Sequence, residues 1–181
     1  MNTNNIIIEK ACFNDLKEIL SLQKLAFQTE AESHGNYDIE PLKQTYESIC
    51  EDFASYTFLK ITLDNRIIAS VKSRINEGTV WVGKLIVSPD FRRKGLGKKL
   101  LNEVEKLYPE AERFQLFTAA SSIHNIRLYE SVGYKIIGEF TDDKQAELIL
   151  VEMAKAKTEN EYFVLQTQYL FIWKPVFHFL P

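Results

Sequence analysis

The chain has 181 residues, of which 45% are hydrophobic, 12% aromatic and 26% charged. This composition predicts one folded domain with a core of ordinary size and excludes global disorder. The formal net charge of −3 argues against nucleic acid as the main partner, although basic residues gather between Arg92 and Lys99.

Cysteine and histidine usage gives no sign of a metal or redox site. Cys12 and Cys50 are in neither a metal-type nor a redox-type spacing, and the three histidines are scattered along the chain. The first five residues lack the basic region and long apolar run of an export signal. We therefore expect two reduced thiols, no bound metal and a cytoplasmic protein.

The first part of the chain is predicted to form one strand and two helices. Residues 6–11 are rich in β-branched side chains, which is typical of a short strand. Apolar residues then recur at helical spacing, so a helix of about four turns should begin with Asn14 or Asp15 as its cap. A polar stretch at residues 30–38 should follow as a loop, and Pro41 should open a second helix.

The second part of the chain is dominated by strand patterns. Turn residues such as Asp64-Asn65 and Glu77-Gly78 separate the first three of them, and Pro109 ends a helix. The strands are expected at residues 56–63, 67–76, 79–88, 114–118, 135–140 and 147–153, and the helices at residues 100–107 and 123–131. This order predicts an α/β (α+β) fold with a mixed, mostly antiparallel central sheet flanked by helices, and one parallel crossover around residue 95.

The connection after Pro89 has the chemistry of a phosphate-binding loop. A strand ends there, a basic loop with Gly95 and Gly97 follows, and a helix begins, with unpaired N–H groups and a partial positive charge at its start. Glycine lets the backbone approach a ligand closely, so the loop is suited to a pyrophosphate. It is neither a Walker loop nor a dinucleotide fingerprint, since no Lys-Ser/Thr follows and position 100 is Leu. The alternative is a solvated strand–helix connection.

Two motifs in sequence order resemble those of the GNAT acetyltransferases. The first is LxVxP at residues 85–89 followed by RxxGxG at residues 92–97, and the second is NxxLYExxGY at residues 125–134. The resemblance covers roughly residues 6–153. It implies a GNAT acyl-CoA N-acyltransferase fold for a domain at residues 1–157.

The resemblance also implies which residues hold acetyl-CoA, the co-substrate. Three strand residues would lie beside the pantetheine arm and bond it through the main chain: Leu85, Ile86 and Val87. The pyrophosphate would be held, mostly by backbone N–H groups, at Arg92, Arg93, Lys94, Gly95, Leu96, Gly97 and Lys98. Many family members carry Asn seven residues before the Tyr of the second motif. This chain has Ser122 there and Asn125 four residues before, and either side chain could reach the cofactor from one helix face.

Tyr129 is the residue to which the resemblance assigns general acid catalysis. It would protonate the CoA thiolate as the tetrahedral intermediate collapses. A phenol with an ordinary pKa of about 10 is protonated at neutral pH and can donate that proton. The alternative is an aromatic side chain that only packs on the sheet.

No general base follows from the resemblance. Candidates lie in the expected loop at residues 30–38, where Glu30, Glu32 and His34 could bind a cationic amine, and Glu77 is a further candidate at a hairpin. The alternative for the loop is a solvated polar segment. Lys84, on the strand beside the thioester, would lie at the rim of the site.

The last segment, residues 158–181, is an apolar extension. Its two apolar runs are far shorter than the roughly 20 residues of a spanning helix. Packing on the core, contact in a homodimer, a poorly ordered extension and membrane association remain alternatives for it; we expect no membrane partner.

The function that these motifs imply is N-acetyltransfer from acetyl-CoA to a primary amine, by direct attack in a ternary complex. The acceptor would be a small-molecule or peptide amine, and the acidic composition slightly favours a small cationic amine. The alternative is a non-catalytic acyl-CoA-binding or interaction module on the same fold.

Overall fold

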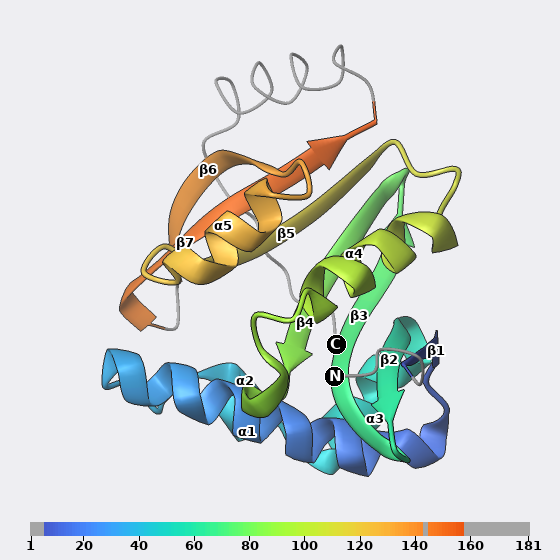
Figure 1. Ribbon diagram of the computed structural model, residues 1–181. Helices are drawn as coiled ribbons and strands as arrows, with labels where there is room; N and C mark the ends of the chain where they lie inside the picture. Colours follow the sequence, from blue (N-terminus) through green and yellow to red (C-terminus); the bar gives the residue numbers. More distant parts are fainter. Residues whose placement is uncertain (1–5, 143–144, 158–181) are drawn as a thin grey trace. The chain divides into compact units, whose positions relative to one another are not determined.

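The computed structural model describes residues 6–142 and 145–157 (Figure 1). These residues divide into two compact units, with the boundary between Pro109 and Glu110. The extension expected at residues 158–181 lies outside the described residues, and the domain boundary at residue 157 stays a prediction.

The first unit is built on four antiparallel strands in the order β1-β2-β3-β4. The strands are β1 (Ile7–Lys10), β2 (Thr57–Leu63), β3 (Arg66–Asn76) and β4 (Thr79–Val87). The helices are α1 (Leu16–His34), α2 (Glu40–Lys43), α3 (Tyr46–Ser55) and α4 (Leu96–Leu107). Short 3-10 turns, η2 (Phe13–Asp15) and η3 (Pro89–Phe91), precede α1 and follow β4. All four predicted strands are confirmed.

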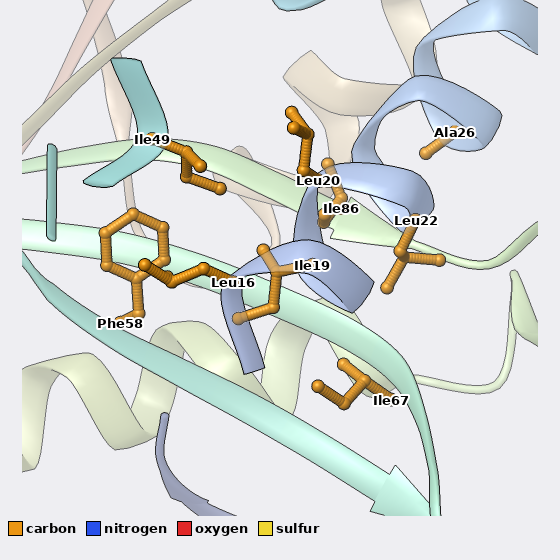
Figure 2. Close-up of a cluster of buried hydrophobic side chains, with 9 residues drawn as sticks. All are labelled: Leu16, Ile19, Leu20, Leu22, Ala26, Ile49, Phe58, Ile67 and Ile86. Carbon is orange, nitrogen blue, oxygen red and sulfur yellow. The ribbon is translucent and has the colours of Figure 1, made fainter. Parts of the chain in front are cut away.

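Helix α1 covers one face of this sheet with a continuous apolar surface. In Figure 2 its buried side chains meet side chains from α3 and from three strands: Leu16, Ile19, Leu20, Leu22 and Ala26 with Ile49, Phe58, Ile67 and Ile86. Residues that alternate with Phe58 along β2, such as Leu59 and Ile61, are also buried, and α4 packs against β2, β3 and β4. Both faces of the sheet are therefore covered, and burial of each large side chain contributes about 1.5–3 kcal/mol.

Two expectations for the helices are wrong. The loop expected at residues 30–38 is helical up to His34, because Glu30 to Glu32 are good helix formers and Ala31 is buried. The helix stops at Gly35, whose φ of 65° is left-handed and whose N–H donates to the carbonyl of Ala31.

The single helix expected from Pro41 is in fact two, α2 and α3. Thr45 separates them in an extended conformation, and its hydroxyl accepts a hydrogen bond from the N–H of Ser48 at 3.2 Å. This N-cap starts a new helix, so the polypeptide changes direction between Lys43 and Tyr46.

The second unit contains a three-stranded antiparallel sheet and one helix. Strand β7 (Gln145–Ala156) pairs on one side with β5 (Arg113–Ala119) and on the other with β6 (Lys135–Asp142), and α5 covers Ile123–Glu130. These elements confirm the predicted ones, with β7 longer at both ends. The parallel crossover expected around residue 95 would join the two units and stays a prediction.

Candidate functional site

The basic loop between β4 and α4 has the backbone of an anion-binding site. Arg93 has a φ of 60° and Gly95 a φ of 76°, so two left-handed residues flank Lys94. Such alternation turns successive N–H groups toward one concavity. Gly95 is also the N-cap of α4, so this concavity opens at the start of the helix.

The start of α4 carries a positive potential that the helix itself does not neutralise. Its N-cap has no side-chain hydrogen bond, and its first turn contains no acidic residue. The N–H groups of Leu96 and Gly97 are in the first turn, where a helix offers no acceptor. A Cβ added to Gly95 would meet no atom within 4 Å, so the glycine is required for its φ rather than for space. The geometry fits a phosphate group at the helix start.

The basic side chains of the loop differ in what they contact. Arg92 donates from Nη2 to the carbonyl of Ala26 in α1 at 2.8 Å, so its guanidinium ties the loop to that helix. Lys94 donates to the carbonyl of Asp90 at 2.9 Å and lies over the ring of Phe91. Arg93 and Lys98 are exposed. A direct contact of Arg92 with phosphate stays a prediction, as does the cofactor role of the other loop residues.

Strand β4 carries a β-bulge just before the loop. Lys72 is paired with Gly83 and Ser70 with Ile86, so Lys84 and Leu85 stand opposite a single residue of β3. Lys84 has a φ of 47°, which is unfavourable for a residue with a Cβ. A bulge leaves backbone groups outside the ladder, where an extended ligand arm could bond them. The predicted pantetheine residues lie here: Leu85 and Val87 are half-buried, and Ile86 is in the core.

The bulge directs Lys84 into a polar cluster that we call the Gln44 network: Gln23, Gln44, Asp52, Lys72 and Lys84. Gln44 is 4% exposed and accepts at Oε1 from Gln23 at 2.9 Å and from Lys84 at 2.6 Å. Its amide nitrogen donates to Asp52 at 2.7 Å, and Lys72 donates to the same carboxylate oxygen at 2.6 Å. The network therefore joins α1, the connection between α2 and α3, β3 and the bulge of β4.

Most of this network was not predicted from the sequence. Gln23 was the one residue whose sequence position indicated a buried polar group. It follows Ile19 by four residues on the apolar face of α1, and it is 1% exposed. Burial lowers the pKa of Lys72 below its usual value, although the hydrogen bond and charge of Asp52 act in the opposite direction. Lys72 also lies 4.4 Å from the ring centroid of Tyr56.

In the second unit, the geometry of α5 explains the second motif. Gly133 has a φ of 98° just after the helix, and the N–H of Tyr134 donates back to the carbonyl of Tyr129 at 3.1 Å. Tyr134 is 2% exposed, and its ring centroid is 6.0 Å from that of Tyr129, which is 8% exposed. The glycine thus folds one tyrosine onto the other and fixes the orientation of Tyr129.

The two predicted cofactor contacts of α5 lie at its start. Ser122 is the N-cap and is buried, and its carbonyl accepts from the N–H groups of Asn125 and Ile126. Asn125 is half-buried one turn before Tyr129. Their contact with a cofactor stays a prediction.

Comparison with known proteins decides the family. The model of the acetyltransferase (GNAT) family matches residues 15–134, which include both motifs. The chain belongs to this family. The resemblance, the fold class and the assignment to the acetyltransferases are therefore confirmed.

Several GNAT proteins of known structure share the fold. The PaiA N-acetyltransferase from Thermoplasma acidophilum, solved in complex with coenzyme A, is 19% identical and has a TM-score of 0.69 over 83% of this chain and 98% of that one. The ribosomal-protein-S18-alanine N-acetyltransferase from Escherichia coli is 18% identical, with a TM-score of 0.68 over 86% of this chain and 97% of that one.

Sequence relatives in the family differ in their acceptors. A spermine/spermidine N(1)-acetyltransferase from Bacillus subtilis is 30% identical over 118 residues, 62% of this chain and 69% of its own length. The [ribosomal protein bS18]-alanine N-acetyltransferase of Salmonella typhimurium is 36% identical over 84 residues, 44% of this chain and 55% of its own length. A further match, the UPF0157 protein YqkA of Bacillus subtilis, is covered over only 34% of its length.

The candidate bases of this GNAT chain lie in different places. Glu30 and Glu32 are in the last turns of α1. Glu32 is exposed and accepts a hydrogen bond from Gln28 at 3.3 Å. The side chains of Glu30 and His34 lie outside the described part of the structure. Glu77 is in the β3–β4 turn, at the other end of this hairpin from the basic loop. A role for Glu30 or Glu32 stays a prediction.

Across residues 6–142 and 145–157, no group of three or more His, Cys, Asp and Glu side chains could hold a metal ion. None of the helices in the same part of the chain has the length and hydropathy needed to cross a bilayer.

Proposed function

We propose that this GNAT protein transfers an acetyl group from acetyl-CoA to the primary amine of a small cationic molecule. The observation that carries the proposal is the left-handed pair Arg93 and Gly95 at the start of α4, a helix whose first turn contains no acidic residue. Backbone N–H groups in that arrangement are suited to a pyrophosphate.

The donor then extends from this loop along β4. Its pantetheine arm bonds the main chain at Val87 and Leu85, so the thioester lies near the bulge at Lys84. The bulge supports this path because it frees backbone groups at the point where the arm would end.

The reaction is a direct displacement at the thioester carbonyl. The neutral amine attacks the carbonyl carbon, a C–N bond forms, and the C–S bond breaks as the tetrahedral intermediate collapses. Tyr129 gives its phenolic proton to the departing thiolate, and the amine loses its extra proton to a base or to water. Packing of Tyr129 against Tyr134 supports this role, because a fixed phenol needs little reorganisation to donate.

The preference for a small cationic amine rests on two points. The chain carries a net charge of −3. One of its sequence relatives, matched over 69% of that relative's length, is a spermine/spermidine N(1)-acetyltransferase. The test is the release of CoA thiol from acetyl-CoA across a panel of small amines and peptides. Release that depends on an amine supports the enzyme; binding of CoA without amine-dependent release would favour a non-catalytic acyl-CoA-binding module instead.

A further inference from the structure

Resting on this proposed function, we infer that Glu40 of α2 binds a second ammonium group of the acceptor, so that the site is selective for diamines and polyamines. Glu40 was not among the candidates that the sequence suggested. Its carboxylate lies 3.1 Å from the ammonium of Lys84, at the bulge of β4, and its side chain is 66% exposed.

Two contacts of α1 order the basic loop and the bulge of β4 along this helix. Ala26 accepts from Arg92, which opens the basic loop, and Gln23 is joined through Gln44 to Lys84 at the bulge. Gln23 and Ala26 are about 4.5 Å apart along the helix axis, at 1.5 Å per residue. The basic loop is therefore tied to α1 at Ala26, and the bulge of β4 is tied to it at Gln23, nearer the start of the helix.

This order separates the acidic residues of the first unit. Glu30 follows Ala26 by one turn, so Glu30 and Glu32 continue away from Gln23, on the side of the basic loop. Glu40 is on the side of the bulge, because α2 returns to the middle of α1, where the carbonyl of Pro41 accepts from Gln23 at 2.9 Å.

The Gln44 network holds this side of the site in place. Gln44 directly follows α2, and its four hydrogen bonds tie the end of that helix to α1, to α3 and, through Lys84, to β4. Lys84 is a positioning residue in this arrangement: its ammonium lies 3.1 Å from Oε2 and 3.3 Å from Oε1 of Glu40. A carboxylate offers about four acceptor sites and the Glu40 side chain is 66% exposed, so further sites remain open to solvent. An ammonium there would pair with the carboxylate while a second, neutral amine attacks the thioester.

The test compares two acceptors of equal length, 1,4-diaminobutane and butylamine, in the full chain. The wild type should have a lower KM for the diamine. In Glu40→Gln the diamine KM should rise about fivefold, equal to about 1 kcal/mol for a solvent-exposed pair, while the butylamine KM, the acetyl-CoA KM and kcat stay within about twofold. Glu51→Gln, which removes an exposed carboxylate from α3, is the matched control and should change neither KM.

The outcomes separate the two claims. A wild type that acetylates no amine removes the proposed function, and this inference with it. An active wild type without a preference for the diamine, or a Glu40→Gln variant that retains the preference, overturns the inference alone. A larger rise in diamine KM for Glu30→Gln or Glu32→Gln than for Glu40→Gln would also overturn it and restore the end of α1 as the acceptor site.

Discussion

Replacing Gly95 by alanine tests whether the left-handed backbone of the basic loop binds the cofactor. The added Cβ meets no atom within 4 Å, so the change has no steric cost. The cost is conformational: a φ of 76° is unfavourable for a residue with a Cβ by about 1–2 kcal/mol. Reduced freedom of the unfolded chain offsets about 0.4–1 kcal/mol of this. The free energy of unfolding should therefore fall by about 0.5–1 kcal/mol.

Gly35→Ala is a matched control for this variant. Gly35 also has a left-handed φ, 65°, and open space around its Cβ position, but it ends α1 rather than forming the basic loop. Urea unfolding should show similar losses of stability in both variants. Calorimetric titration with CoA should show an affinity about tenfold weaker only in Gly95→Ala, where relief of the strain redirects the N–H groups. Unchanged CoA affinity in Gly95→Ala, or an equal loss in Gly35→Ala, would refute the assignment of the loop.

Three further predictions concern other parts of the molecule. Gln44→Leu removes hydrogen bonds to two charged groups and gains some apolar burial, so urea unfolding should show a loss of stability of about 2 kcal/mol. The control, Gln28→Leu at an exposed position, should change stability by less than about 0.5 kcal/mol. Equal losses in the two variants would contradict a stabilising role for the Gln44 network. Tyr129→Phe should lower kcat about 100-fold with little change in CoA affinity, and an unchanged kcat would exclude Tyr129 as the acid. Burial alone would raise the pKa of Asp15, but hydrogen bonds from Lys60 and a backbone N–H lower it overall from 3.8. Since the folded pKa lies below the unfolded one, Asp15 stabilises the fold above pH 3.8 and this contribution is lost as the pH falls through the folded pKa. Asp15→Asn should therefore be about 1 kcal/mol less stable than the wild type at pH 7, and the difference should shrink in acid unfolding titrations; a constant difference would contradict the shift.

The strands could be predicted because each has a local signal. Asp64 and Asn65 both adopt a left-handed φ in the β2–β3 turn, as expected of these residue types between two strand-like runs. The backbone of the basic loop was likewise predictable, since it depends on glycine and on the start of a helix, both of which are visible in a short stretch of sequence. Its binding of a phosphate stays a prediction.

The errors and omissions concern features set by distant contacts. The last turns of α1 are polar in sequence and look like a loop; among their described side chains, Ala31 is buried, whereas Gln28 and Glu32 are exposed. The left-handed residue of the β4 bulge is Lys84 rather than a glycine, and the isolated Gly83 beside it is the local signal that was not used. Gln44 is 21 residues from Gln23 and 40 from Lys84, and only the folded chain brings the three together. Glu40 was missed for the same reason.

The central claim is that this chain moves an acetyl group from acetyl-CoA to an amine. The most direct measurement is mass spectrometry of the amine products formed by the full chain with acetyl-CoA, alongside the amount of free CoA thiol. We expect N-acetylated amine and CoA in equal amounts, with product formation about 100-fold slower in Tyr129→Phe. Thiol release without acetylated amine, or CoA binding with neither product, would contradict it.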